Sequence, residues 1–315
     1  MSSRNRLQPV RDRTSVAIGD AVAGICTPVH AILKFTIFVR SLVAGAPRDD
    51  MRKRRRPTSG PMWSCYTETF MHYIYGINSV AEALKARGRA FAWVGVAKER
   101  HDLRLQRVVE ECRRQGVAVR FVGRAELDRM AGNNAHQGVV AVTSAKQYND
   151  LDDVIEARRS QYSLVVVLDG VEDPHNLGAI LRTADAAGAN GVIIPERRAA
   201  GVTGTVTKAS AGASEHLPIA KVTNIARTLE DLKSKNLWIV GLDERGAQSY
   251  DSLDYEMDCA VVLGAEGKGL HDLVAKKCDF LVSIPMLGKV PSLNVSVAAG
   301  IVLYEIVRQR RKQSA

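Results

Sequence analysis

The hydrophobic positions from residue 72 onward follow two spacings, one typical of strands and one typical of helices. Short runs of apolar residues predict buried strands at 91–96, 118–122, 138–143, 164–168, 191–195, 238–242, 260–263 and 280–284. Apolar residues three and four positions apart predict helices that begin near residue 80 and at 103–114, 125–131, 151–159, 177–187 and 295–310. Because strands and helices alternate, the pattern predicts the α/β class.

The same pattern divides the chain into two globular parts. Residues 71–146 hold three expected strands that alternate with three helices, which is typical of a compact α/β sandwich. The run 164–168 is apolar without a break, so it predicts a central parallel strand that is covered on both faces. We expect a small domain at 71–146, a connector at 147–162 and a larger parallel-sheet domain at 163–315.

Polar residues mark the expected beginnings of three helices. Asn78 or Ser79 is the expected N-cap of the first helix, and Asn176 that of the helix at 177–187. Asn294 or Ser292 is the expected N-cap of the final helix, since either side chain could accept a hydrogen bond from the first turn.

The first 70 residues have a different composition from the rest. A mostly apolar stretch is followed by the basic run 52–56, and no uncharged segment is long enough to span a membrane. Three interpretations stay open. The segment is an organellar transit peptide, a polybasic arm that contacts RNA or a membrane, or an untranslated sequence ahead of a start at Met71. We expect disorder if it is translated.

The net charge of +10 is unevenly distributed along the chain. Lys and Arg number 12 against 5 Asp and Glu in residues 1–70, 13 against 7 in 71–146, and 19 against 22 in 147–315. The small domain is basic and the larger domain is slightly acidic. This distribution suits a small domain that binds a polyanion, joined to a larger domain that binds a different ligand. The small domain has no RNP-type aromatic motif, so base stacking is not expected to be its main mode of binding.

The cysteines and histidines give little support for a disulfide or a metal. The five cysteines are scattered with no CxxC pair, and the seven histidines show no HxxxH or HExxH spacing. This usage favours a reducing, cytoplasmic location and a protein without a structural metal.

Three polar clusters in the larger domain lie where strands give way to helices, which is where open α/β sheets bind ligands. They are Asp173-Pro174-His175-Asn176-Leu177-Gly178 running into Arg182, Gly264-Ala265-Glu266-Gly267-Lys268-Gly269, and Pro291-Ser292-Leu293-Asn294-Val295-Ser296.

Each cluster also has a purely structural explanation when it is considered alone. The polar residues could be helix caps, Arg182 could form an i,i+3 ion pair with Asp185, and the glycines could form a flexible loop. The glycine cluster nevertheless disfavours two classes of protein. A Walker A loop needs Ser or Thr where Gly269 stands, and a Rossmann glycine motif would open a βαβ unit, so a nucleotide triphosphatase and a dinucleotide-dependent oxidoreductase are not expected.

Taken together, in this order and spacing, the clusters resemble the SpoU (TrmH) branch of the SPOUT RNA ribose 2′-O-methyltransferases over residues 72–312. The resemblance implies a C-terminal SPOUT domain with a parallel sheet and a deep trefoil knot, preceded by a small L30e-like α/β RNA-binding domain. It implies methyl transfer from S-adenosylmethionine to a ribose 2′-OH, with the closest likeness to bacterial enzymes that act on a guanosine of large-subunit (23S) ribosomal RNA. It also implies a homodimer, without a metal or stable membrane association. A tRNA substrate, or a non-catalytic RNA-binding or ribosome-assembly protein of the same fold, remains the alternative.

The resemblance also implies roles for individual residues. The catalytic set is Arg182, Asn176, Glu266, Ser292 and Asn294, and the cofactor-binding set is Gly264, Gly267, Gly269, Ile284 and Leu293. Arg182 either assists deprotonation of the ribose hydroxyl or holds the adjacent phosphate. The permanent charge of a guanidinium favours the second role. Arg182 is further expected to complete the pocket of the partner subunit.

Overall fold

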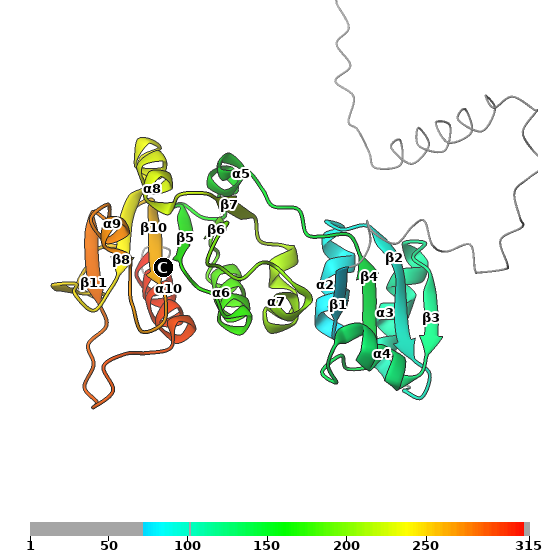
Figure 1. Ribbon diagram of the computed structural model, residues 1–315. Coiled ribbons are helices and arrows are strands. Elements are labelled where there is room, and N and C mark those ends of the chain that lie inside the picture. Colours follow the sequence, from blue (N-terminus) through cyan, green and yellow to red (C-terminus); the bar gives the residue numbers. More distant parts are fainter. Residues whose placement is uncertain (1–71, 101, 312–315) are drawn as a thin grey trace, which may run out of the picture. The chain divides into compact units, whose positions relative to one another are not determined.

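The computed structural model describes residues 72–100 and 102–311, so the interpretations of residues 1–70 lie outside the described residues. The first part of the described chain is a small domain with helices on both faces of one sheet (Figure 1). Its strands are β1 (His72–Tyr75), β2 (Phe91–Ala97), β3 (Val119–Val122) and β4 (Val139–Thr143), and its helices are α2 (Ile77–Ala86), α3 (Leu103–Arg114) and α4 (Arg124–Ala131).

The small domain is built around a mixed sheet with the strand order β1-β4-β2-β3. Strands β2 and β3 pair in parallel, whereas β4 pairs antiparallel with both β1 and β2. Helices α2 and α3 bury their apolar residues against one face of this sheet, and α4 covers part of the other face. The helix predicted at 103–114 is confirmed to the residue, with Asp102 as its N-cap.

Two expectations for the start of this domain are wrong. The sequence pattern left out β1, because a four-residue strand with two tyrosines gives only a weak alternating signal. Helix α2 begins at Ile77 after Gly76, and neither Asn78 nor Ser79 caps it. Ser79 lies inside the helix, where its buried hydroxyl donates a hydrogen bond to the backbone carbonyl of Thr207 at 3.2 Å.

The larger domain contains one sheet of parallel strands in the order β7-β6-β5-β10-β8-β11-β9. Its strands are β5 (Leu164–Asp169), β6 (Gly191–Pro195), β7 (Ile219–Val222), β8 (Trp238–Leu242), β9 (Gln248–Ser249), β10 (Cys259–Gly264) and β11 (Phe280–Ser283). Its helices are α5 (Leu151–Glu156), α6 (Pro174–Ala186), α7 (Gly204–Ala209), the 3-10 turn η1 (Ala213–Glu215), α8 (Ile225–Ser234), α9 (Asp272–Ala275) and α10 (Val295–Arg311).

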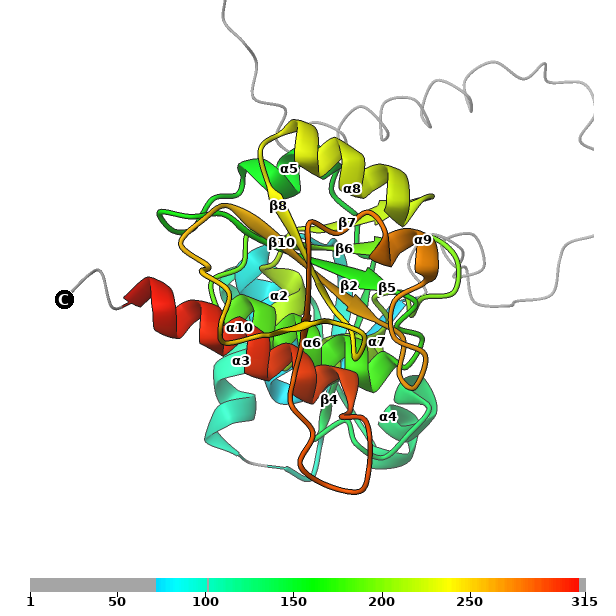
Figure 2. The ribbon, with the colours of Figure 1, turned by 90° about the vertical axis from the view of Figure 1, so that its left-hand side faces the viewer.

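Helices cover both faces of this sheet, as the unbroken apolar run at 164–168 predicts. Figure 2 shows α5, α8 and α9 on one side of the strands and α6, α7 and α10 on the other. Alternate residues of β5 therefore enter two separate cores. Val166 packs in the core with α6 and α10, while Val165 and Val167 pack in the core with α5 and α8.

The first turn of α6 corrects one expectation that bears on the site. The helix begins at Pro174, and its N-cap is Asp173, whose carboxylate accepts a hydrogen bond from the backbone N–H of His175 at 2.9 Å. Proline is favoured at the first helical position because its missing N–H needs no partner there. Asn176 is therefore not the N-cap, and its side chain is available for other contacts.

The strand order brings the three polar clusters to one edge of the sheet. They follow β5, β10 and β11, and parallel strands place their carboxyl ends at the same edge. Strand β8 lies between β10 and β11, so the chain that leaves β10 crosses β8 before it reaches β11. The deep trefoil knot implied by the resemblance stays a prediction.

A buried ion pair joins the small domain to the larger one. Arg89 lies between α2 and β2, and its Nε and Nη2 each donate to a carboxylate oxygen of Glu215, both at 2.9 Å. Their side chains are only 2% and 1% exposed. The hydroxyls of Thr207 and Ser214 also donate to Glu215, so the buried carboxylate is well supplied with hydrogen bonds.

Candidate active site

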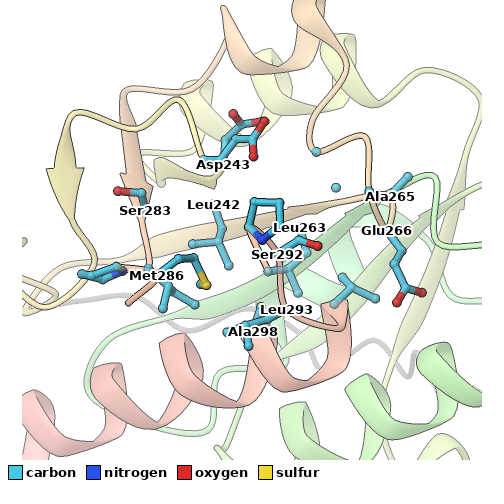
Figure 3. Close-up of a pocket in the computed structure, with 18 residues that line it drawn as sticks. Leu242, Asp243, Leu263, Ala265, Glu266, Ser283, Met286, Ser292, Leu293 and Ala298 are labelled. Atoms are coloured by element: carbon cyan, nitrogen blue, oxygen red, sulfur yellow. The ribbon is translucent and has the colours of Figure 1, made fainter. Parts of the chain in front are cut away.

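A pocket at this edge of the sheet has a volume of about 640 Å³ and opens between the loops after β8, β10 and β11 (Figure 3). All five residues of the expected cofactor-binding set line it, together with Glu266 and Ser292 of the expected catalytic set. Figure 3 places Glu266 at one end of the pocket and Met286 at the other. The second and third sequence clusters therefore form the walls of a single cavity.

The glycine loop after β10, residues 264–269, folds back on itself so closely that a side chain at Gly264 would clash with Gly269. Ala265 and Gly269 exchange two backbone hydrogen bonds of 3.1 Å across the loop. A Cβ on Gly264 would lie 2.2 Å from the carbonyl carbon of Gly269, so glycine is required where these two backbones meet. The closed loop leaves its backbone exposed along one side of the pocket.

A buried carboxylate at the end of β8 fixes this loop in place. Asp243 accepts hydrogen bonds from the backbone N–H of Leu270 at 3.0 Å and from Nε of Arg245 at 2.7 Å. The Arg245 guanidinium, helped by the backbone N–H groups of Leu270 and Arg245, lowers the pKa of Asp243 to about 2. Asp243 is therefore charged at neutral pH and ties the glycine loop to the neighbouring strand.

Three side chains from the three clusters meet in one hydrogen-bonded group beside the pocket. The Asn176 amide donates to Glu266 Oε2 at 3.1 Å, and the Asn294 amide donates to Asn176 Oδ1 at 2.9 Å. The same Asn294 amide lies 3.5 Å from Glu266 Oε1. Residues 28 to 118 positions apart in the chain are thus held in contact around one carboxylate.

Asn294 has a second, structural function at the start of α10. Its side-chain oxygen accepts hydrogen bonds from the backbone N–H, at 2.9 Å, and the hydroxyl of Ser296. This is the capping contact predicted from the sequence, and it leaves the NH₂ group of Asn294 free to face Asn176 and Glu266. Cap and cluster therefore share one side chain.

A smaller pocket of about 240 Å³ lies on the other side of the glycine loop. Ala265, Glu266 and Val295 line both this pocket and the larger one. Asn176 and the exposed carboxylate of Glu172 also line the smaller pocket. The three-residue cluster thus stands where two cavities adjoin.

Arg182 is the one member of the expected catalytic set that neither joins this cluster nor lines a pocket described above. It is exposed on α6, lines neither pocket, and makes no hydrogen bond or ion pair with another described residue. The alternative for Arg182 taken alone, an ion pair with Asp185, does not form, because Asp185 instead accepts a hydrogen bond from Nη1 of Arg159 at 2.8 Å. Arg182 therefore presents an unpaired guanidinium to solvent.

The sequence reasoning missed Asp243, although the signal that identified the other clusters applies to it. Asp243 directly follows the apolar strand β8, whose carboxyl end lies at the same edge of the sheet as those of β5 and β10. Within residues 72–311, apart from residue 101, no group of three or more His, Cys, Asp or Glu is placed to hold a metal ion. No helix in this described part is long and apolar enough to cross a membrane.

Comparison with known proteins assigns both domains to one family. Residues 163–304 match the SpoU rRNA Methylase family, and residues 73–149 match the family described as RNA 2′-O ribose methyltransferase substrate binding. The protein YacO of Bacillus subtilis, named as a TrmH family tRNA/rRNA methyltransferase, is 47% identical over 240 residues, which cover 76% of this chain and 96% of YacO. The chain belongs to the SpoU/TrmH family of RNA methyltransferases.

Solved SpoU/TrmH structures share the fold. The SpoU methyltransferase AviRb from Streptomyces viridochromogenes, solved with AdoMet, gives a TM-score of 0.64 at 26% identity and covers 76% of this chain and 90% of AviRb. An AdoMet-bound rRNA methyltransferase from Sinorhizobium meliloti gives 0.62 at 26% identity, with 77% and 88% covered. The α/β class and the parallel sheet predicted from the sequence of this SpoU/TrmH chain are confirmed.

Proposed function

We propose that this protein transfers a methyl group from S-adenosylmethionine to a ribose 2′-OH of RNA, with a guanosine of large-subunit ribosomal RNA as its target. The observation that carries the proposal is the position of the Asn176–Glu266–Asn294 cluster between two adjoining pockets. Two ligands can meet there, which a group transfer requires. The match of residues 73–149 to a 2′-O ribose methyltransferase substrate-binding family supports a ribose hydroxyl in RNA as the acceptor.

The larger pocket fits S-adenosylmethionine in size and in charge. Its volume of about 640 Å³ lies within the usual range for small-molecule sites, and Leu242 and Leu263 give it apolar walls. When bound, the cofactor supplies a methyl group on a positively charged sulfonium, and the pocket carboxylates Glu244 and Glu266 complement that charge. The residues proposed to contact the cofactor are Gly264, Gly267, Gly269, Ile284 and Leu293.

The polar cluster is proposed to orient the ribose. A 2′-oxygen must approach the methyl carbon in line with the bond that breaks, so positioning contributes much of the rate. The Glu266 carboxylate accepts from Asn176 and Asn294 yet keeps lone pairs with which it can accept a hydrogen bond from the ribose hydroxyl. Ser292 lines the larger pocket and is proposed to add a further hydrogen bond to the ribose.

Arg182 is proposed to act in the pocket of a partner subunit, where it holds the phosphate beside the target ribose. An exposed guanidinium without a partner among residues 72–100 and 102–311 is suited to bind a phosphate through its rigid donor fork. The proposed homodimer is supported by apolar side chains exposed near the site. Val297 and Tyr304, two turns apart on α10, are each 51% exposed, and Leu287 of the adjoining loop is 99% exposed.

The two domains are proposed to divide the work of this enzyme in the cytoplasm. Residues 71–146, with a net charge of +6, would bind the RNA, and residues 163–315 would hold the cofactor and perform the transfer. The connecting residues 147–162 include α5, which packs on the sheet of the larger domain. The buried Arg89–Glu215 pair supports a fixed placement of one domain on the other. A fixed placement lets binding energy from distant parts of the RNA position the target ribose.

Transfer of a labelled methyl group tests the proposal. Purified protein is incubated with methyl-labelled S-adenosylmethionine and either unmodified large-subunit ribosomal RNA or unmodified tRNA. The expected result is stoichiometric labelling of the ribosomal RNA at one guanosine 2′-O position. Labelling of tRNA alone would replace the proposed substrate, and labelling of a base would contradict ribose methylation. The absence of any transfer would favour a non-catalytic RNA-binding protein of this fold.

A further inference from the structure

The open part of the small-domain sheet carries an arginine stacked on a tryptophan. Trp93 lies on β2 on the face that α4 covers only in part, since Leu127 is the one residue that α4 buries. The guanidinium carbon of Arg120, from the edge strand β3, lies 4.4 Å from the centre of the Trp93 ring. This distance is typical of a cation–π contact.

The Trp93 indole lies against a glycine of its own strand, Gly95. A Cβ on Gly95 would lie 3.1 Å from Cζ3 of Trp93, so the indole lies against a position without a side chain. Gly95 is the neighbour of Arg120 in the parallel pairing of β2 with β3. The glycine thus lets the indole lie close to the sheet while Arg120 reaches it from the adjacent strand.

The pair is partly exposed to solvent, and Trp93 belongs to a row of residues that runs across the sheet. Trp93 is half-buried and Arg120 exposed, and Trp93 pairs across β4 with Val142, which pairs with Tyr73 on β1. Residues opposite one another in a sheet share a face, so a second aromatic ring belongs to the same row as Trp93. Tyr73 packs against the small core under α4, so the platform consists of the Arg120 guanidinium and the Trp93 indole, planar groups of the kind on which bases stack.

The net charge of the small domain indicates which ligand binds the Arg120–Trp93 platform. A net charge of +6 over residues 71–146 attracts a polyanion. Nucleic-acid bases are the flat groups that a polyanion carries. We propose that the Arg120–Trp93 platform stacks an unpaired base of the RNA, so that single-stranded RNA is bound through this face of the small domain.

This inference rests on the proposed function, because it names how the RNA of that reaction is held. The missing RNP motif argued only against base stacking as the main mode of binding, and the platform adds stacking of one base to the electrostatic attraction. Stacking of one base on an aromatic or guanidinium plane contributes on the order of 1–3 kcal/mol, so loss of the platform should weaken RNA binding by roughly 5- to 150-fold.

Fluorescence of Trp93 gives a direct test. The chain has three tryptophans, and the variant Trp63→Phe with Trp238→Phe leaves Trp93 as the sole emitter. Unmodified large-subunit ribosomal RNA and a ten-nucleotide oligoadenylate are the probes. Both are expected to quench Trp93 emission on binding. Emission unchanged at RNA concentrations that saturate binding, as measured by filter retention, would overturn the inference.

Matched charge variants separate stacking from simple attraction. Arg120→Gln and Arg107→Gln each remove one exposed positive charge, but Arg107 lies on α3, which packs on the opposite face of the sheet. Arg120→Gln and Trp93→Ala are expected to raise the dissociation constant for RNA about tenfold, against about twofold for Arg107→Gln, with Trp93→Phe in between. Equal effects of the two arginine variants would contradict the stacking platform while leaving the methyltransferase proposal intact. RNA binding absent from the unsubstituted protein would instead overturn both.

Discussion

The side chain of Asn294 joins the beginning of the last helix to Asn176 on α6, 118 residues away, through a 2.9 Å hydrogen bond. One amide group therefore carries two tasks, because its oxygen caps α10 while its nitrogen orders the polar cluster around Glu266. The two tasks can be separated, because only the nitrogen reaches the cluster.

Asn294→Ser is expected to keep the protein folded and to impair the reaction. Serine caps helices about as well as asparagine, but it is too short to reach Asn176. Urea unfolding should therefore give a stability close to that of the unsubstituted protein, while Asn294→Ala loses about 1 kcal/mol. Methyl transfer should fall in both variants. Full activity in Asn294→Ser would show that the contact with Asn176 is dispensable.

Two glycines of the same loop should respond differently to alanine. Gly269 and Gly267 both have positive φ angles, +65° and +72°, so each substitution costs about 1–2 kcal/mol of backbone strain. At Gly269 the added Cβ would also lie 2.7 Å from Asp243 Oδ2, whereas nothing lies within 4 Å at Gly267. Calorimetry should show a loss of S-adenosylmethionine affinity for Gly269→Ala that is at least tenfold greater than for Gly267→Ala. Equal losses would mean that the Asp243 contact does not shape the pocket.

The Asp243 carboxylate predicts a specific dependence of stability on pH. Its pKa is lowered from 3.8 to about 2 in the folded protein, so the folded state favours the charged form. The resulting stabilisation is complete above the unfolded pKa and is lost as pH falls through the folded one. The difference in unfolding free energy between the unsubstituted protein and Asp243→Asn should be constant above about pH 5 and shrink towards pH 2. A difference that does not change with pH would contradict the assignment.

The buried Arg89–Glu215 pair should be costly to break and inexpensive to replace. Arg89→Met leaves an unpaired carboxylate that is 1% exposed, and such changes typically cost about 3–5 kcal/mol. The double variant Arg89→Met, Glu215→Met removes both charges. It should be less destabilised than the single variant Arg89→Met, in which the Glu215 carboxylate stays buried without its partner. Denaturant unfolding of the two variants measures the difference. If the double variant is the less stable of the two, the buried charge is not the source of the cost.

Mixed dimers can test whether Arg182 serves the partner subunit. Arg182→Ala is expected to abolish transfer while cofactor affinity stays near that of the unsubstituted protein, because Arg182 lines neither pocket of its own chain. Equal amounts of Arg182→Ala and Glu266→Gln, unfolded and refolded together, should then regain roughly a quarter of full activity, since one site in each heterodimer is intact. If Arg182 acts within its own chain, the mixture stays inactive. Loss of cofactor affinity in Arg182→Ala would instead place this residue in the cofactor pocket.

Much of the fold could be predicted because the long elements carry strong periodic signals. The α3 helix and the buried strand β5 were predicted with their boundaries nearly correct, and the clusters that follow β5, β10 and β11 were correctly expected to meet. The short strands β1, β7 and β9 were missed, because an alternating pattern over four residues or fewer is a weak signal. The helices α7, α8 and α9 were missed as well, although α8 is ten residues long.

The local chemistry of the site was harder to predict from sequence. The sequence predicts Asn176 as a helix cap, but α6 begins at Pro174 and its N-cap is Asp173. The side-chain amide of Asn176 therefore contacts Glu266 instead of the helix backbone. Contacts between residues so far apart depend on strand order, which periodicity does not determine. The roles assigned to Arg182 and to the cofactor-binding glycines stay predictions until the variants above are measured.

Glu266 is part of the wall between the two pockets, and this shared position has a thermodynamic consequence. Any ligand that moves the Glu266 carboxylate on entering one pocket changes the surface that the ligand of the other pocket meets. The two binding free energies are then coupled, and linkage requires the coupling to be equal in both directions. Cofactor affinity measured with and without RNA should therefore change by the same factor as RNA affinity measured with and without cofactor.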